Sequence, residues 1–353
     1  MLVHIQILRF VAAVAVVAFH VLGVAPDGYK VAESPISFVV SYGGRGVDLF
    51  FVISGFIIFY ATHSSANDGA ALTAADFLRR RVTRIVPLYF VVIFAVTMLA
   101  ITLPSTFGAP DWYTPRHILK SLAFIAFTDG DVPVVYLGWS LEYEMYFYLV
   151  TALLMALTRQ VWRNIVMMFA ALATIGRIPG VGAALGHYAF LVDSMILEFV
   201  LGVIVGHAFV NGRLSWPMAA AAAAAIAALL ATDPLGRVVV SGVPAAGLVA
   251  AAAFIGRGRT APSWPELALA RLGDASYSIY LAQVETVTLA SRLIAHAVPA
   301  VSPWLLLIAT CAVVVALGLL LNIFVERPLL KLARRLGGPH TSRIQAVAEA
   351  RIG

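Results

Sequence analysis

LRFVAAVAVVAFH, residues 8–20, is a run of apolar residues that carries Arg9 near one end and His20 at the other. Apolar runs of this kind recur along the whole chain of 353 residues, in which 61% of residues are hydrophobic and 12% are charged. A soluble domain cannot bury that much apolar surface, whereas repeated stretches of about 20 apolar residues are typical of bilayer-spanning helices. The sequence therefore predicts an all-α, polytopic integral membrane protein.

About ten stretches meet the length criterion for a membrane span. They lie at 5–24, 46–62, 85–104, 137–157, 163–178, 186–209, 216–232, 236–255, 274–297 and 302–325. The apolar stretch at 117–128 is too short to cross and is expected at the surface or as a re-entrant segment. We expect residues 1–336 to form one transmembrane domain and residues 337–353 to form a short, disordered cytoplasmic tail.

The distribution of lysine and arginine predicts the orientation of the chain. With the N-terminus in the cytoplasm, the inside loops and the C-terminal tail would hold most of these residues, so both termini are placed inside. The pI near 9.6 could indicate a nucleic-acid-binding protein, but the basic residues lie in short loops between spans. We therefore expect membrane lipids and no nucleic acid as partners. Cys311 is the only cysteine, so no intramolecular disulfide can form.

Ionisable side chains inside a bilayer are costly and therefore indicate functional sites. Arg9 and His20 are eleven residues apart, which places them about 20° apart around a helix and about 16 Å apart along it. Both would face one groove, with Arg9 in the cytoplasmic half and His20 in the outer half. The alternative is that Arg9 extends to the cytoplasmic headgroups and His20 only ends the span.

A carboxylate is expected near His20 because GGRGVDLFFVISGF (43–56) places Asp48 at a similar depth. Spans joined by a short loop are usually neighbours, and a carboxylate beside a histidine orients the ring and raises its basicity. Asp48 could instead complement the dipole at a helix N-terminus. Ser54 and Gly55 are expected to serve close contact between helices rather than catalysis.

A second carboxylate candidate lies in LGWSLEYEMYFYL (137–149). We expect Glu144, deeper in the span, to be buried and Glu142 to be shallower and solvated. The aromatic residues of this segment could form an interfacial belt or stack against a sugar ring. They are Trp139, Tyr143, Tyr146 and Tyr148.

The cytoplasmic side carries cations and hydroxyl groups. Arg81 and Arg84, one helical turn apart, could bind a phosphate group or could only set the topology. Glu326 could pair with one of these arginines. The segment 273–283 brings several hydroxyl groups to the same side, at Ser276, Tyr277, Ser278 and Tyr280.

No metal-ligand spacing, P-loop or nucleophile elbow is present in the sequence, so no metal site is expected. Cations on the inner side and a histidine with two carboxylates on the outer side would suit group transfer across the membrane. An anionic donor would dock from the cytoplasm, and the histidine would deprotonate an acceptor outside.

Taken together, these motifs resemble the membrane-bound acyltransferase-3 family, and most closely its exopolysaccharide-acylating branch. The similarity covers nearly the whole chain, with the motifs in the expected order. They are Arg9 with His20, GVDLFFVISGF (46–56), RVTR (81–84), WSL followed by Glu144, LEFVLGVIVG (197–206), LGDASYSIYL (272–281) and VERP (325–328). One departure is Gln283, where family members commonly have a histidine.

The resemblance implies a membrane O-acyltransferase in the bacterial inner membrane, with cytoplasmic acyl-CoA as donor and no tightly bound cofactor. An acetyl or succinyl group would pass to a hydroxyl of a periplasmic polysaccharide or other glycan, with His20 as base or acyl relay. The expected catalytic residues are His20, Asp48 and Glu144. The expected substrate-binding residues are Arg9, Arg81, Arg84, Trp139, Ser140, Tyr148, Ser276, Tyr277, Gln283 and Glu326.

Two alternatives remain open at this point. A transporter or flippase for glycans or lipid-linked sugars would also place polar groups in the membrane, although no related halves with broken helices are evident. The second alternative is a catalytically inactive relative that binds glycan or a partner. Gln283 is consistent with this alternative because an amide cannot titrate.

Overall fold

The computed structural model describes residues 2–26, 28–67, 72–104, 113–127, 130–212, 236–255 and 261–336. Within these ranges the chain forms helices and turns and no strand, which confirms the expected all-α fold. Among the residues described, six helical segments are long and apolar enough to cross a membrane. They are Val3–Val24, Pro35–His63, Ala74–Thr102, Val181–Asn211, Val238–Ile255 and Pro303–Ala333. The expected count of about ten spans is not confirmed, and both the stretch 216–232 and the tail 337–353 lie outside the described residues.

The described elements follow one another in the order below. The first part of the chain forms α1 (Val3–Val24), α2 (Pro35–Ser41), η1 (Tyr42–Arg45), α3 (Gly46–Asn67), α4 (Ala74–Thr102), α6 (Pro115–Leu122), α7 (Gly138–Leu157) and α8 (Val161–Gly176). The middle forms α9 (Val181–Leu185), η3 (Gly186–Val192), η4 (Ser194–Ile196), α10 (Leu197–Asn211), η5 (Val238–Gly242) and α12 (Val243–Ile255). The last part forms α13 (Trp264–Asp274), α14 (Ser276–Ala297), α15 (Pro303–Leu321), η6 (Asn322–Glu326) and α16 (Arg327–Leu336). The short α6 agrees with the expectation that 117–128 does not cross.

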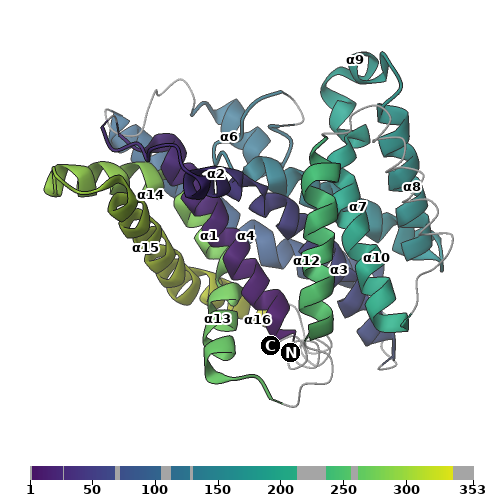
Figure 1. Cartoon of the computed structure of the whole chain (residues 1–353). Coiled ribbons are helices and arrows are strands. Elements are labelled where there is room, and N and C mark those ends of the chain that lie inside the picture. The colour runs from purple at the N-terminus through teal and green to yellow at the C-terminus, as the bar shows by residue number, and fades with distance from the viewer. Residues whose placement is uncertain are drawn as a thin grey trace.

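Helix α1 runs through the bundle and contacts helices from both halves of the chain, namely α3, α12, α13, α14 and α15. The pair α14 and α15 lies on one side of α1, and α7, α8 and α10 lie on the other (Figure 1). We call the end of the bundle that carries α13 and α16 the lower end, and the end that carries α2, α6 and α9 the upper end (Figure 1). Since α1 begins at the lower end, His20 lies toward the upper end.

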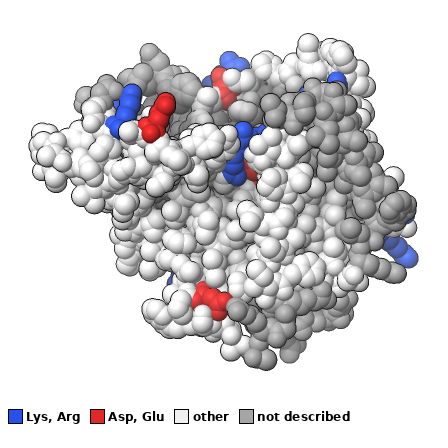
Figure 2. Space-filling model, viewed as in Figure 1, with Lys and Arg blue, Asp and Glu red and all other residues white. Residues whose placement is uncertain are grey.

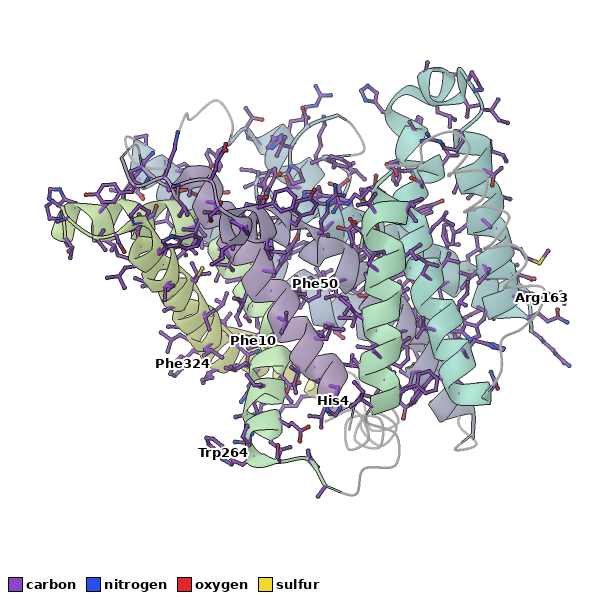
Figure 3. All side chains as sticks on the ribbon, viewed as in Figure 1. His4, Phe10, Phe50, Arg163, Trp264 and Phe324 are labelled. Atoms are coloured by element: carbon purple, nitrogen blue, oxygen red, sulfur yellow. The ribbon has the colours of Figure 1, made fainter. Side chains whose placement is uncertain are left out.

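The outer surface of the bundle is largely apolar. Figure 2 shows a broad uncharged band across the middle of one face, with charged side chains mainly above and below it. Large apolar side chains point outward around the bundle, including Phe94, 66% exposed, and Phe324, 71% exposed (Figure 3). Such a continuous apolar exterior is unfavourable in water and suits contact with lipid. The chain is a multi-pass membrane protein.

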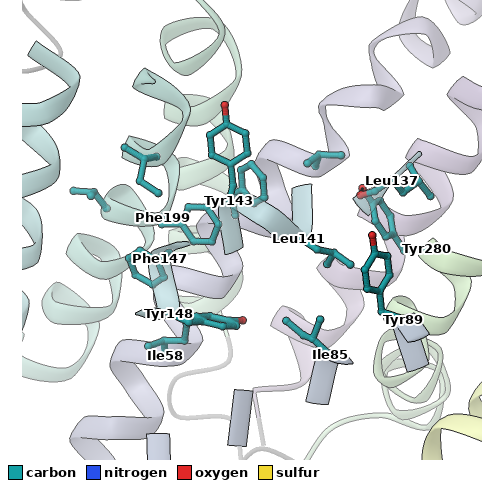
Figure 4. Packing of buried hydrophobic residues seen from close by; sticks show 14 of the residues in the cluster. Ile58, Ile85, Tyr89, Leu137, Leu141, Tyr143, Phe147, Tyr148, Phe199 and Tyr280 are labelled. Carbon is teal, nitrogen blue, oxygen red and sulfur yellow. Dashed lines mark hydrogen bonds between the residues drawn. The ribbon is translucent and has the colours of Figure 1, made fainter. Parts of the chain in front are cut away.

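The interior is held together by close helix contacts and stacked aromatic rings. A Cβ atom added at Gly55 of α3 would lie 2.0 Å from the carbonyl oxygen of Phe199, so the backbones of α3 and α10 touch there. This contact agrees with the role expected for Gly55. Beside it, the ring centroids of Phe147 and Phe199 lie 4.8 Å apart (Figure 4). This packing fixes α3 and α7, which carry several residues of the site described next.

Candidate functional site

His20 lies in a pocket near the upper end of α1, which we call the histidine pocket. Its volume is about 360 Å³. It is lined by Val16, Phe19, His20, Ser41, Gly44, Arg45, Val47, Tyr136, Leu137, Trp139 and Arg237. The ring of Tyr136 meets the imidazole of His20 edge-on, with centroids 6.1 Å apart. A half-buried imidazole with aromatic neighbours and polar groups in one pocket is a candidate acid–base group.

The hydrogen bond between His20 and Gln283 determines which nitrogen of His20 carries the proton. The Nε2 of Gln283 donates to the backbone oxygen of Tyr280 at 2.9 Å, so its Oε1 atom is left as the acceptor. This Oε1 lies 3.0 Å from Nδ1 of His20. Because an amide oxygen can only accept, Nδ1 of neutral His20 is the donor and Nε2 is the basic nitrogen. Gln283 therefore orients the ring of His20, which is the role that the sequence suggested for Asp48.

The expected pairing of Asp48 with His20 is wrong. Asp48 is fully buried and accepts two hydrogen bonds from Arg237, each 2.7 Å long, from Nε to Oδ1 and from Nη2 to Oδ2. A bidentate arginine–carboxylate pair is among the strongest polar contacts in proteins, and it commits both oxygens of Asp48. The side chain thus points toward η5 and α10 rather than toward α1.

A second buried carboxyl group, that of Glu198, lies near the pair formed by Asp48 and Arg237. Glu198 of α10 is 0% exposed and lies close enough to Asp48 and Arg237 to feel the charge of both. Neither oxygen of Glu198 has a hydrogen-bond partner in the described part of the chain. Neither Glu198 nor Arg237 was among the expected site residues. The signal for Glu198 was present, since an ionisable residue within the apolar segment 197–206 is a functional candidate.

Below the histidine pocket lies a second, more enclosed space of about 140 Å³, which we call the arginine cavity. Its polar lining consists of Arg9, Ser54, Arg81, Arg84, Ser140, Glu144, Tyr148, Ser276, Tyr277 and Tyr280. Its apolar lining consists of Val47, Phe50, Phe51, Ile53, Ile57, Ile85 and Leu141. Val47 lines both spaces, so the two are adjacent. Arg9 and His20 therefore each reach one of two neighbouring cavities, as the shared-face argument expected.

The possible pairing of Glu326 with an arginine is confirmed, and the partner is Arg84. Glu326 is 1% exposed and also accepts hydrogen bonds from Ser278 and from Asn322, the latter at 2.7 Å. These contacts join α4, α14 and η6 across the bundle. Residues Asn322–Glu326 form a π-helical turn, a distortion that is frequent at functional sites. Glu326 lines neither cavity and acts by holding Arg84.

Glu144 belongs to the arginine cavity and not to the histidine pocket. Its Oε1 accepts hydrogen bonds from Ser54, at 3.0 Å, and from Tyr148. The expected contrast with Glu142 is reversed, because Glu142 is only 3% exposed and accepts a hydrogen bond from the backbone of Phe127. Glu144 is half-buried because the cavity opens beside it. The three expected catalytic residues thus lie in three different environments.

Some polar atoms of the arginine cavity have no partner in the described part of the chain. The Nε atom of Arg81 and the hydroxyl oxygen of Ser276 are both buried without a hydrogen bond there. The guanidinium of Arg81 packs on the ring of Tyr148, 5.9 Å from its centroid. Buried polar groups without partners are rare, and a cluster of them in a cavity indicates a ligand site. With Arg9 and Arg84, the charge of this cavity suits an anion.

The remaining expected binding residues divide between the two spaces. Trp139 lines the histidine pocket, whereas Ser140 and Tyr277 line the arginine cavity. The hydroxyl groups of Ser140 and Tyr280 are hydrogen-bonded at 2.9 Å, close to where the two spaces adjoin. Tyr277 donates to the backbone oxygen of Ile85 at 2.8 Å.

Fold and site together define a multi-pass membrane protein in which the arginine cavity, whose charge suits an anion, lies below the histidine pocket. The chain belongs to the acyltransferase-3 family, whose acyltransferase domain matches residues 2–323. It is therefore an acyltransferase of a membrane-protein family.

Two curated proteins illustrate this relationship. The exopolysaccharide production protein ExoZ of Rhizobium meliloti (strain 1021) is 33% identical over 320 residues, which cover 83% of this chain and 91% of that protein. The acyltransferase MdmB of Streptomyces mycarofaciens is 26% identical over 378 residues, covering 97% of this chain and 95% of that protein. No solved structure matches the chain.

Proposed function

We propose that this protein transfers a small acyl group, acetyl or succinyl, from cytoplasmic acyl-CoA to a hydroxyl of an extracytoplasmic polysaccharide. The bacterial inner membrane is the proposed location, with the lower end of the bundle in the cytoplasm. The observation that carries the proposal is a cavity that adjoins the pocket of His20 and in which Nε of Arg81 and the hydroxyl of Ser276 have no hydrogen bond to any described residue. The name of the relative that produces exopolysaccharide supports the class of acceptor.

The arginine cavity is the proposed site for the donor. Arginine binds phosphate groups through planar, paired N–H donors, and a CoA donor carries several phosphates. The phosphates would lie near Arg81 and Arg84, and the acyl-bearing arm would extend upward past Ser140 and Tyr280. The roughly 16 Å of helix rise between Arg9 and His20 is comparable to the extended pantetheine arm.

The histidine pocket is the proposed site of the chemistry. Nε2 of His20 would take the proton from the acceptor hydroxyl, whose oxygen then attacks the carbonyl carbon of the thioester. An ester bond forms and the carbon–sulfur bond breaks. His20 then returns the proton to the sulfur atom, so CoA leaves as the free thiol. Gln283 keeps Nε2 as the basic nitrogen throughout. A transporter would move its substrate without releasing CoA. Membership of an acyltransferase family therefore favours an enzyme over a transporter.

The test is acyl transfer across a sealed membrane. The purified protein is reconstituted in liposomes, labelled acetyl-CoA or succinyl-CoA is supplied on one side, and a polysaccharide acceptor on the other. We expect label in the polysaccharide only when the donor is on the side of the lower end of the bundle and the acceptor is on the side of the upper end. Labelled polysaccharide in protein-free liposomes, or none with either donor, would contradict the proposal.

Replacing Gln283 with methionine should reduce acyl transfer about fivefold, because Met fills a similar volume but cannot fix the tautomer of His20. A net hydrogen bond contributes about 1 kcal/mol, which corresponds to about a fivefold change in rate. The loss should appear in kcat with little change in the KM for the donor. Gln283→Asn, which keeps the amide, should recover only part of the activity. An unchanged kcat in the Met variant would remove Gln283 from the mechanism.

Replacing Arg81 with glutamine should weaken binding of a CoA analogue, and the remaining affinity should depend less on salt. Arg81→Lys should restore the charge but only part of the affinity, because an ammonium cannot form paired contacts. Titration of the purified variants with the analogue measures both effects. Arg163, in the first turn of α8 and outside both cavities, provides the control as Arg163→Gln. Equal affinity in the Arg81 and Arg163 variants would contradict a donor site at Arg81.

A further inference from the structure

We propose that the histidine pocket takes an anionic glycan, with a carboxylate of the acceptor held by Arg237 and Arg45 while a nearby hydroxyl reaches His20. This inference rests on the proposed function and specifies its acceptor class. The pocket holds both arginines and His20. Among the described residues that line it there is no Asp or Glu, so no acidic side chain faces the ligand.

Arg237 is held rigidly, and within the described ranges its Nη1 atom makes no hydrogen bond. Its Nε and Nη2 atoms donate to the two oxygens of Asp48, which lies behind it and does not line the pocket. A guanidinium has five N–H groups in a planar fork, so the end edge formed by Nη1 and Nη2 still offers two parallel donors. That edge matches a second carboxylate. The guanidinium also packs over the ring of Trp139, 5.5 Å from its centroid.

The charges around Arg237 leave the pocket positive. Asp48 accepts both of these hydrogen bonds from behind Arg237, so one negative charge balances this arginine from its far side. Arg45, the exposed residue at the end of η1, adds a second positive charge to the lining, and no ion pair with it is seen among the described residues. A pocket lined with one sign of charge raises the local concentration of ligands of the opposite sign. Arg45 and Arg237, which both line the pocket, therefore select an acidic sugar over a neutral one.

The remaining wall suits a sugar ring. Tyr136 and Trp139 present aromatic surface next to His20, and such surfaces pack against the apolar faces of sugars. A volume of about 360 Å³ lies within the usual range for small-molecule sites. A uronic acid or another carboxylate-bearing residue would place its charge on the arginines and its ring on the aromatic side chains.

The experiment compares two matched acceptors in the reconstituted system. One is an oligosaccharide that contains a uronic acid, and the other is the same oligosaccharide as its methyl ester, which is neutral. We expect kcat/KM for the acid to exceed that for the ester about tenfold or more, since charge-assisted hydrogen bonds contribute about 1.5–3 kcal/mol. The preference should shrink with added salt.

Variants locate the preference in this pocket. Arg45→Gln should reduce the acid-to-ester ratio, whereas Arg116→Gln should not, because Arg116 is exposed on α6 outside the pocket. Arg237→Gln alone would leave Asp48 buried without its partner, so it is combined with Asp48→Asn. This neutral pair should fold and lose the preference. A ratio near one in the wild-type protein, with both acceptors acylated, would overturn the inference and leave the proposed function intact. No transfer to either acceptor would overturn both.

Discussion

Replacing His20 with alanine is expected to reduce acyl transfer about 10²–10⁴-fold, which is the usual range for loss of a general base. His20 is the only histidine that lines either cavity in the described part of the chain. Its neighbour Gln283 cannot take over, since an amide does not titrate in the relevant range. Acylated polysaccharide, quantified by mass spectrometry from cells carrying each variant, gives the measurement.

The control for this experiment is His187→Ala. His187 is an exposed residue of η3 at the upper end, so its loss removes a histidine from the same side without touching the histidine pocket. Both variants should reach the membrane at wild-type levels, because an alanine at position 20 keeps the span apolar. Acylation that persists unchanged in His20→Ala would show that the base lies elsewhere.

Replacing Glu326 with leucine is expected to destabilise the protein by about 3–5 kcal/mol, the cost of removing one partner from a buried ion pair. Arg84 would lose its counter-charge, and Ser278 and Asn322 would each lose an acceptor. The three helical segments that meet at Glu326 would then separate more easily. Thermal unfolding of the detergent-solubilised protein measures the loss.

The double variant Arg84→Met with Glu326→Leu separates stability from donor binding. Replacing a buried pair by apolar residues of similar volume is often neutral or stabilising. We therefore expect the unfolding temperature to recover, while affinity for a CoA analogue stays low because Arg84 is absent from the arginine cavity. Recovery of both properties would mean that Arg84 has only a structural role.

Several features of the site could be predicted from residue spacing. Arg9 and His20 share a helix, so the geometry of one helix was enough to direct them toward neighbouring cavities. The role of Gly55 followed from the need for small residues where helices touch. The pairing of Glu326 with one of two arginines was open in the sequence, and the structure selects Arg84.

Other features depended on partners far along the chain. Asp48 and Arg237 are 189 positions apart, and His20 and Gln283 are 263 positions apart. Depth along a span predicts which side chains lie at the same level, but it does not give the rotation of each helix about its axis. For Asp48 and Glu144 that rotation decided the partner, and both predictions of their surroundings were wrong.

The local patterns of the chain were sufficient for the all-α membrane fold, for the family and for the placement of Arg9 and His20 on one helix beside two adjacent spaces. Hydrophobic periodicity and the high cost of charge in a bilayer act on each segment separately, so they can be read without knowing its neighbours. Tertiary packing decided that Arg237 and Glu198 enclose Asp48, that Gln283 orients His20, and that Glu144 joins the arginines. A buried polar group must find a partner among whichever helices are packed against it, and that choice exists only once the helices have assembled.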